Sequence, residues 1–373
     1  MKLKCRLCAH EEGNLVPHIE SQHGGEKGLT DYIARYGGVN AVIHPSLQSG
    51  EPAAPAPIMA AARAAAIPDV ATETVDIAGV SLPARRGVPE ALRRFIPKVD
   101  EAYHFTETAA RIARSILKAR PIALAGHTGT GKTSVIMQIA ARIGQPVVRV
   151  NLNQQTTISD FVGMWGAKGG ETVWIDGALP WSMRNDVWII ADEADYGEPA
   201  ILSVLNPVTE REPRLLLKEK DGEVIVPSEH WRIFVTGNTL GQYSEWRHLY
   251  QGTNLMNEAW LDRFRLYKVE YMAEAAEAEV LKDAIPLMTL SVAKELVKVA
   301  TLARQAFLKE ELSSPFSTRR LIDWAEELME LRHFKAEAPF KAAEATIFSK
   351  VSREDAAVID GFMRRILLGR NTP

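Results

Sequence analysis

The chain has 373 residues, enough for two or three domains, and 46% of them are hydrophobic and 24% charged. A formal net charge of -3 gives no electrostatic support for general binding to nucleic acid or to an anionic membrane. No apolar run approaches the roughly 20 residues that span a bilayer, and the first ten residues lack the apolar stretch of a secretory signal. The composition therefore predicts a cytoplasmic protein without a membrane segment.

The segment 1–44 carries both cysteines of the chain, in the pattern C-x2-C-x9-H-x4-H. The members of the pattern are Cys5, Cys8, His18 and His23. Two thiolates and two imidazoles are ligands of a closed tetrahedral zinc site, and a segment this small needs such a metal to fold. Together with the following LTDYIARYG, the pattern resembles the zinc fingers of the Ros and MucR type. We predict a structural Zn²⁺ here; the alternatives are a metal-free redox pair and an unfolded tail.

The predicted finger holds five Lys or Arg residues and five Asp or Glu residues, so it is electrically neutral. DNA-binding modules are usually basic, because much of their affinity comes from contacts with phosphates. The sequence therefore leaves open whether the finger contacts DNA or docks onto a protein.

Beyond the finger, the sequence predicts a linker and then two domains of different composition. Residues 45–72 are rich in Pro and Ala without apolar periodicity, which is typical of a semi-extended linker. The predicted strands are Pro121–Ala125, Pro146–Val150, Val187–Ala191 and Ile233–Thr236. A predicted helix, Thr106–Ala119, precedes the first strand, and another, Ser134–Ile143, follows it. This alternation predicts an α/β domain over 73–270, with a parallel sheet covered on both faces by helices. From residue 271 only helical patterns remain, which predicts an all-helical domain over 271–373.

The first predicted strand is followed directly by GHTGTGKT, which fits G-x-x-x-x-G-K-[ST] between a strand and a helix. The motif consists of Gly126, His127, Thr128, Gly129, Thr130, Gly131, Lys132 and Thr133. Its glycines let successive backbone N–H groups point at phosphate oxygens, and the next helix adds the positive end of its dipole. We expect Lys132 to bind the β- and γ-phosphates of ATP, and the Thr133 hydroxyl to bind Mg²⁺.

Two later strands are expected to bring further polar side chains to the same edge of the sheet. VWIIADEAD contains Asp192, expected to hold Mg²⁺, and Glu193, expected to act as general base on the attacking water. RIFVTGN ends in Asn238, on a strand expected to lie between the other two, where the amide would reach the γ-phosphate. The alternative for Asn238 is an asparagine in a simple turn.

LDRFRL supplies an arginine just before the helical domain. Arg263 is the candidate for a guanidinium that offsets charge on the γ-phosphate of a neighbouring molecule, with Arg265 as second choice. The alternative is a surface arginine in an ion pair.

The helical domain contains FSTRR, in which Ser317 is a good N-cap for the following helix. Phe316 and Leu321 are spaced as a hydrophobic staple across that cap. Arg319 or Arg320 could then reach back to the nucleotide of the same molecule.

Taken in order, these motifs resemble the MoxR branch of AAA+ ATPases and, within it, the ATPase subunits of aerobic cobaltochelatase. The likeness covers about residues 96–325 and includes IPKVDEAYHF, GHTGTGKT, VVRVNLNQQTTISDFVG, DGALPWSM, VTGN, LDRF and STRRLIDWAEEL. The resemblance implies that Asn238 is sensor 1, Arg263 the arginine finger and Arg319 sensor 2. The segment Ile96–Phe105 is expected to form the adenine wall by its position. The finger at 1–44 departs from those subunits.

The resemblance also implies how such a motor works. It implies a hexameric ring, a partner with a von Willebrand A domain, and a hairpin insert over about 163–181. Trp165, Trp174 and Trp181 in this insert are candidate contact residues, with core packing as the alternative for Trp181. A second hypothesis is an ATPase directed to nucleic acid by its finger. The sequence does not name the client.

Overall fold

The structure is a computed structural model that describes residues 3–4, 11–12, 73–240, 247–250, 252–254 and 256–369. The chain divides into two compact units, Met1–Ala60 and Ala61–Pro373. In the first unit, β1 (Leu3–Lys4) and β2 (Glu11–Glu12) pair as antiparallel strands. The four predicted zinc ligands and the predicted linker 45–72 lie outside the described residues.

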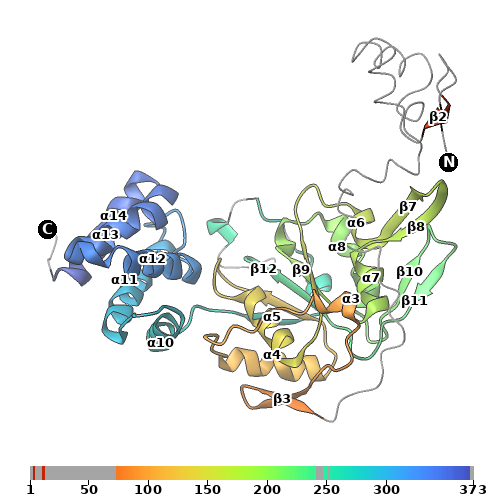
Figure 1. The fold of residues 1–373 in the computed structure, drawn as a ribbon, viewed down its shortest axis with the longest axis horizontal. Coiled ribbons are helices and arrows are strands. Elements are labelled where there is room, and N and C mark those ends of the chain that lie inside the picture. The colour runs from red at the N-terminus through yellow and green to blue at the C-terminus, as the bar shows by residue number, and fades with distance from the viewer. Residues whose placement is uncertain are drawn as a thin grey trace. The chain divides into compact units, whose positions relative to one another are not determined.

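The second unit is built on a five-stranded parallel sheet with the order β13-β5-β12-β9-β6. Its neighbouring strands β9 and β12 are labelled in Figure 1. The strands are β5 (Ile122–Ala125), β6 (Val147–Asn151), β9 (Trp188–Asp192), β12 (Ile233–Gly237) and β13 (Arg265–Lys268). β5, β9 and β12 are buried along their whole length, as expected for central strands of a parallel sheet covered on both faces. The α/β fold with a parallel sheet is thereby confirmed, and Ile233–Gly237 lies between the two strands as predicted.

Helices α4 (Glu107–Leu117) and α5 (Lys132–Ile143) share one hydrophobic core with the sheet and with the hairpin of β3 (Thr74–Ile77) and β4 (Val80–Pro83). Strand side chains alternate between the two faces of a sheet. Ile122 and Leu124 of β5, with Trp188 and Ile190 of β9, therefore face the same layer and pack in this core. The shorter helices of the α/β domain are α3 (Glu90–Arg93), α6 (Ile158–Val162), α7 (Ala178–Asn185), α8 (Pro199–Ser203) and α9 (Glu258–Leu261).

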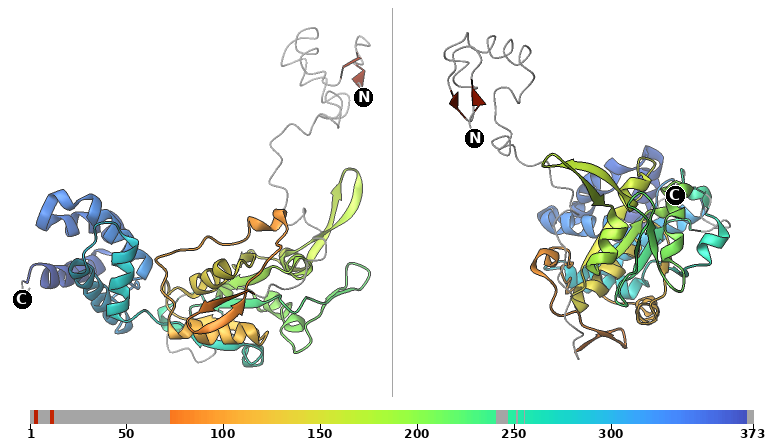
Figure 2. Two further views of the ribbon diagram at one scale, coloured as in Figure 1. Left: turned by 60° about the horizontal axis from the view of Figure 1, so that its bottom comes forward. Right: turned by 90° about the vertical axis from the view of Figure 1, so that its right-hand side faces the viewer.

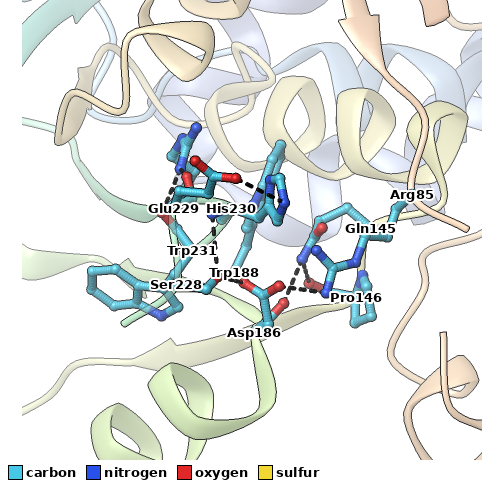
Figure 3. Close-up of polar contacts among 10 residues, drawn as sticks. Arg85, Gln145, Pro146, Asp186, Trp188, Ser228, Glu229, His230 and Trp231 are labelled. Atoms are coloured by element: carbon cyan, nitrogen blue, oxygen red, sulfur yellow. Dashed lines mark hydrogen bonds and ion pairs between the residues drawn. The ribbon is translucent and has the colours of Figure 1, made fainter. Parts of the chain in front are cut away.

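A polar cluster closes the edge of the sheet at which β6, β9 and β12 begin (Figure 3). Asp186 ends α7 in a left-handed conformation with φ 56°, and its side chain is buried. Its carboxylate forms an ion pair with Arg85 and accepts a hydrogen bond from the Ser228 hydroxyl at 2.5 Å. The Gln145 amide donates to the Asp186 backbone oxygen at 2.8 Å. This cluster joins the turns that precede three strands, and so fixes the sheet at the edge opposite the phosphate-binding loop.

Two β-hairpins extend from the same side of the α/β domain (Figure 2). They are β7 (Gly163–Lys168) with β8 (Glu171–Asp176), and β10 (Leu215–Leu217) with β11 (Glu223–Ile225). The Trp165 indole N–H donates to the Glu219 backbone oxygen at 2.8 Å and thereby links the two hairpins. Trp165 is 47% exposed and packs edge-on against Trp174, whereas Trp181 is buried in α7 beside Phe95. Trp181 is therefore a core residue.

The chain then continues as a helical domain (Figure 1). Its helices are α10 (Glu274–Ala284), α11 (Leu290–Leu308), α12 (Thr318–Glu330), α13 (Ala338–Thr346) and α14 (Arg353–Leu367). They enclose their own hydrophobic core, in which Phe316, Leu321 and Trp324 are fully buried. No helix among the described residues is long and apolar enough to cross a membrane. The 3₁₀ turns among the residues that the structure describes are η3 (Ala194–Tyr196), η4 (Asn206–Val208), η5 (Arg247–Leu249), η6 (Arg332–Glu337) and η7 (Phe348–Lys350).

Candidate active site

The predicted phosphate-binding loop connects the buried strand β5 to helix α5. Gly129 and Gly131 have φ values of +76° and +88°, which residues with a side chain rarely adopt. The Thr130 hydroxyl donates to the His127 backbone oxygen at 2.9 Å and tightens the turn. The helix begins at Lys132, so its free N–H groups and the positive end of its dipole face the loop.

The Lys132 ammonium reaches across this loop to the neighbouring strand. It donates to the backbone oxygens of Gly126 at 2.7 Å and His127 at 2.9 Å, and to the Asn238 side-chain oxygen at 3.0 Å. Burial lowers the pKa of Lys132 to about 8, although the nearby carboxylates, Asp195 foremost, oppose this shift. The structure thus brings together two predicted site residues, Lys132 and Asn238, that are far apart in the sequence.

Asp192, at the end of β9, is a buried carboxylate with three partners from three different elements. Its Oδ1 accepts hydrogen bonds from the hydroxyls of Thr133, at 3.0 Å, and Thr236. Its Oδ2 forms an ion pair with the guanidinium of Arg149 on β6. Thr133 and Asp192 therefore lie together, as two oxygen donors suited to Mg²⁺.

Glu193 leaves the sheet directly after this buried aspartate. Its backbone is left-handed, with φ 57° and ψ 42°, a conformation that is uncommon for residues other than glycine. The chain therefore turns sharply, and Glu193 is exposed while Asp192 is buried. An exposed carboxylate at the rim of the phosphate-binding loop is accessible to water, as a general base requires.

Asp195 links the segment after β9 to the segment after β12. It is fully buried, and its Oδ2 accepts hydrogen bonds from the backbone N–H groups of Asn238 at 2.7 Å and Thr239 at 2.9 Å. The Thr239 hydroxyl donates to the same oxygen at 3.1 Å. Burial raises the pKa of the adjacent Tyr196 hydroxyl, which hydrogen-bonds to the Asn238 side chain. Asp195 and Tyr196 therefore hold Asn238 from both its backbone and its side chain.

Two tyrosines hold the phosphate-binding loop from the other side. The Tyr250 hydroxyl accepts a hydrogen bond from the Thr128 N–H at 3.2 Å and lies 3.0 Å from His127 Nδ1. The Tyr271 hydroxyl donates to the Thr128 backbone oxygen at 2.8 Å, and its ring stacks on His127. Burial, with a smaller effect of Lys132, lowers the pKa of His127 to about 4, so its imidazole is neutral at neutral pH.

Helix α12 of the helical domain begins against the same loop. A Cβ atom on Gly129 would lie 2.2 Å from Cβ of Ser317, whose hydroxyl caps the helix by accepting from the Arg320 N–H at 3.1 Å. Arg319 is exposed, and Arg320 is half-buried above the Phe316 ring. Both predicted arginines therefore lie in the first turn of a helix that touches the phosphate-binding loop.

Arg263 lies away from these groups. Its guanidinium pairs with Glu210 at 3.3 Å and donates to the Ala259 backbone oxygen. Arg265 is paired in parallel register with Ile122, the first residue of β5, so Arg263 precedes the start of this strand pair. The phosphate-binding loop follows the other end of β5, and four strand residues advance about 13 Å. Arg263 therefore does not reach the phosphate-binding loop of its own chain.

The expected adenine wall lies beside α5. The Asp100 N–H donates to the Gln138 side chain at 3.0 Å, and Phe105 lies under the Arg142 guanidinium, 5.0 Å from it. His104 contacts Asp283 of α10 at 3.1 Å. This segment thus borders both domains.

Five further residues of the site have no role assigned by the motifs and were not predicted: Arg149, Asp195, Thr236, Tyr250 and Tyr271. Two of these have a visible signal: Arg149 interrupts an otherwise apolar strand, and Asp195 is the third acid of DEAD. The tyrosines carry no local signal, because their contacts depend on tertiary structure.

The sheet order, the glycine-containing phosphate-binding loop, and Asp192 and Glu193 at the end of β9 define a P-loop ATPase of the AAA+ class. Residues 121–264 match the AAA domain of the dynein-related subfamily, and residues 277–366 match the CbbQ/NirQ/NorQ C-terminal family. Aerobic cobaltochelatase subunit CobS of Sinorhizobium sp is 32% identical over 70% of this chain and 81% of its own length. Protein CbbQ of Hydrogenophilus thermoluteolus is 27% identical over 61% of this chain and 82% of its own length. Protein NorQ of Paracoccus denitrificans is 34% identical over 35% of this chain and 46% of its own length.

The chain belongs to the AAA+ ATPases of the CobS, CbbQ and NorQ type. It is an enzyme that hydrolyses ATP, with Mg²⁺ as the accompanying ion. The oxygen donors of Thr133 and Asp192 and the amides of the loop fit these groups.

Proposed function

We propose that the chain forms a ring whose nucleotide sites are completed between subunits, and that hydrolysis in the ring remodels a partner protein. The observation that carries the ring is the separation of Arg263 from the phosphate-binding loop of its own chain. Phosphoryl transfer is accelerated by a guanidinium on the γ-phosphate. A neighbouring subunit is the natural source of that guanidinium. By the family resemblance the ring is a hexamer.

Within each site, the proposed roles follow from position. Lys132 binds the β- and γ-phosphates, and Thr133 and Asp192 hold Mg²⁺, which offsets phosphate charge when bound. Glu193 takes the proton from the attacking water, and Asn238 orients that water beside Lys132. Arg319 of the same chain and Arg263 of the neighbour would bind the γ-phosphate. Residues 96–105 border the adenine.

A mixing experiment tests the intersubunit site. Lys132→Ala subunits lack ATP binding and Arg263→Ala subunits lack the guanidinium, so each variant alone should have no turnover. Mixed rings should recover part of the wild-type rate, because an Arg263 from one variant meets an intact loop in the other. Turnover by an isolated Arg263→Ala monomer at the wild-type rate would refute the shared site.

The partner we propose carries a von Willebrand A domain, and the linked hairpins β7–β8 and β10–β11 form the contact surface. The similarity to a subunit of cobaltochelatase supports the existence of a partner protein. The exposed Trp165 supports the hairpins as the surface that the partner contacts. The Glu193→Gln variant should bind ATP without hydrolysing it and so retain its partner on purification from the host. Lys132→Ala, which binds no ATP, is the matched control. Recovery of nucleic acid instead of such a protein would favour a nucleic-acid-directed ATPase.

A further inference from the structure

The carboxylate assigned to Mg²⁺ is already paired with a cation to which the sequence motifs assign no role. Arg149 lies on β6, the edge strand of the sheet, and its guanidinium Nε forms an ion pair with Asp192 Oδ2. The Asp192 side chain is 4% exposed, whereas that of Arg149 is 51% exposed. A buried carboxylate meets a half-solvated guanidinium at the edge of the sheet.

The pair compensates a charge that would otherwise be costly to bury. A buried carboxylate without a cation is strongly disfavoured, because hydroxyl donors alone do not replace its hydration. Among the described residues, the other carboxylate oxygen of Asp192 accepts hydrogen bonds from two hydroxyls. Lys132, another cation of the site, directs its hydrogen bonds to two backbone oxygens and to Asn238. In this arrangement Arg149 supplies the counter-charge.

The same pair opposes the arrival of a metal ion. Mg²⁺ and a guanidinium beside one carboxylate repel each other, and this repulsion is strong where water is scarce. The guanidinium of Arg149 has no other hydrogen-bond or ion-pair partner in the described part of the chain, and half of the side chain is already in solvent. It can therefore leave the carboxylate at little cost in contacts or hydration.

We propose that Arg149 is the exchangeable counter-ion of Asp192: it holds the carboxylate in the nucleotide-free site and is displaced when Mg²⁺ arrives with ATP. This proposal rests on the proposed role of Asp192 as a Mg²⁺ ligand. Arg149 is then a positioning residue that sets how much Mg²⁺ the site needs. The competition makes the nucleotide-free site stable and raises the Mg²⁺ concentration at which ATP binds tightly.

The test measures binding of a fluorescent, non-hydrolysable ATP analogue to the full-length chain as Mg²⁺ is varied, and again in excess chelator. In Arg149→Ala, the Mg²⁺ concentration at the midpoint should fall about fivefold, because a competing cation is gone. Binding in chelator should not change. Arg149→Lys keeps a cation on the strand and should restore most of the wild-type midpoint. Arg86→Ala, which removes an exposed ion pair with Glu73 far from the motifs, should behave as wild type.

Thermal unfolding provides the second readout. Arg149→Ala should lower the unfolding temperature of the nucleotide-free protein and leave that of the Mg²⁺-analogue complex unchanged. An equal loss in both states would make Arg149 a structural residue and overturn the proposal. Equal weakening of analogue binding with and without Mg²⁺ would also overturn it, since Arg149 would then contact the nucleotide.

An additional variant separates this proposal from the role of Asp192. If Asp192→Asn leaves the Mg²⁺ midpoint unchanged, Asp192 is not the Mg²⁺ ligand and both assignments fail. If Asp192→Asn shifts the midpoint and Arg149→Ala does not, only the counter-ion role of Arg149 fails.

Discussion

Asp195 shows how one buried side chain can fix the position of another, here Asn238, which is proposed to orient the attacking water. It touches no residue of the phosphate-binding loop through a described hydrogen bond, yet it binds the backbone on both sides of the Asn238–Thr239 peptide. Asn238 in turn accepts from Lys132. The position of the asparagine amide therefore depends on a carboxylate 43 residues earlier in the chain.

We predict that Asp195→Ala lowers kcat for ATP by about a hundredfold, because a displacement of about 1 Å in a positioning group has effects of this size. Affinity for ATP should change less than kcat, since Asp195 makes no described hydrogen bond to the phosphate-binding loop. The unfolding free energy should fall by about 2–3 kcal/mol, because two buried N–H groups lose their acceptor. Steady-state kinetics with an ATP-binding titration and urea unfolding measure these three quantities.

Asp195→Asn is the conservative control, because its amide oxygen can still accept from both N–H groups. It should recover part of the lost kcat. A variant in which kcat and affinity fall together would contradict a role confined to Asn238.

At the scale of elements, the helical domain depends on a buried ion pair between α10 and α11. Arg304 donates to Glu277 through two nitrogens, at 2.6 and 2.8 Å, and to the Phe316 backbone oxygen at 2.8 Å. Glu277 also accepts from the Thr318 hydroxyl at 2.7 Å, and the guanidinium stacks on Tyr271. The pair thus connects the core of the helical domain to the start of α12 and to a tyrosine that holds the phosphate-binding loop.

We predict that Glu277→Ala destabilises the protein by about 3–5 kcal/mol, the usual loss when one member of a buried pair is removed. The cause is the unpaired guanidinium of Arg304, which is 8% exposed. Chemical unfolding followed by circular dichroism measures the change. Lys282→Ala, which removes an exposed pair with Glu279 on the same helix, should cost less than about 0.5 kcal/mol. Similar effects of both changes would show that burial of the pair carries no special weight.

The elements also show what the sequence could predict and what it could not. The four predicted strands appear as β5, β6, β9 and β12 with ends within one or two residues, because buried parallel strands read as short apolar runs. β13 was not predicted, since RLYK is an edge strand of four residues with only Leu266 and Tyr267 between two charged residues. The hairpins β3–β4 and β10–β11 were also missed. Their strands are three or four residues long, too short for a clear period.

For the candidate site, the sequence could predict the residues that lie within local motifs. A strand followed by carboxylates fixes Asp192 at a sheet edge, and the parallel order then brings Thr133 to it. The partners Arg149 and Tyr250 could not be deduced, because each depends on side chains meeting across the tertiary structure. The roles of Glu193, Arg263 and Arg319 stay predictions.

At the scale of the whole molecule, all the motifs proposed for nucleotide binding and hydrolysis lie in the unit Ala61–Pro373. The predicted zinc ligands all lie in Met1–Ala60. Loss of zinc from the predicted finger should therefore leave ATP hydrolysis intact.

We predict one Zn²⁺ per chain, held by Cys5, Cys8, His18 and His23, and measurable by elemental analysis of purified protein. Replacing Cys5 and Cys8 by Ser should remove the zinc, because the thiolates are its strongest ligands. Basal ATP turnover, measured with excess Mg²⁺, should stay within about twofold of wild type. Protein that contains no zinc when prepared without chelator would refute the finger, and lost turnover in the double variant would refute the separation.

The contact between Gly129 and Ser317 leaves no free space between the phosphate-binding loop and the first turn of α12. Because even one carbon atom on Gly129 would collide with Ser317 at 2.2 Å, the helical domain rests on the backbone that wraps the phosphates. Two segments in such close contact pass small displacements from one to the other. We therefore expect that loss of a phosphate group displaces the first turn of α12. The distance that this turn can move would then limit the movement of the helical domain.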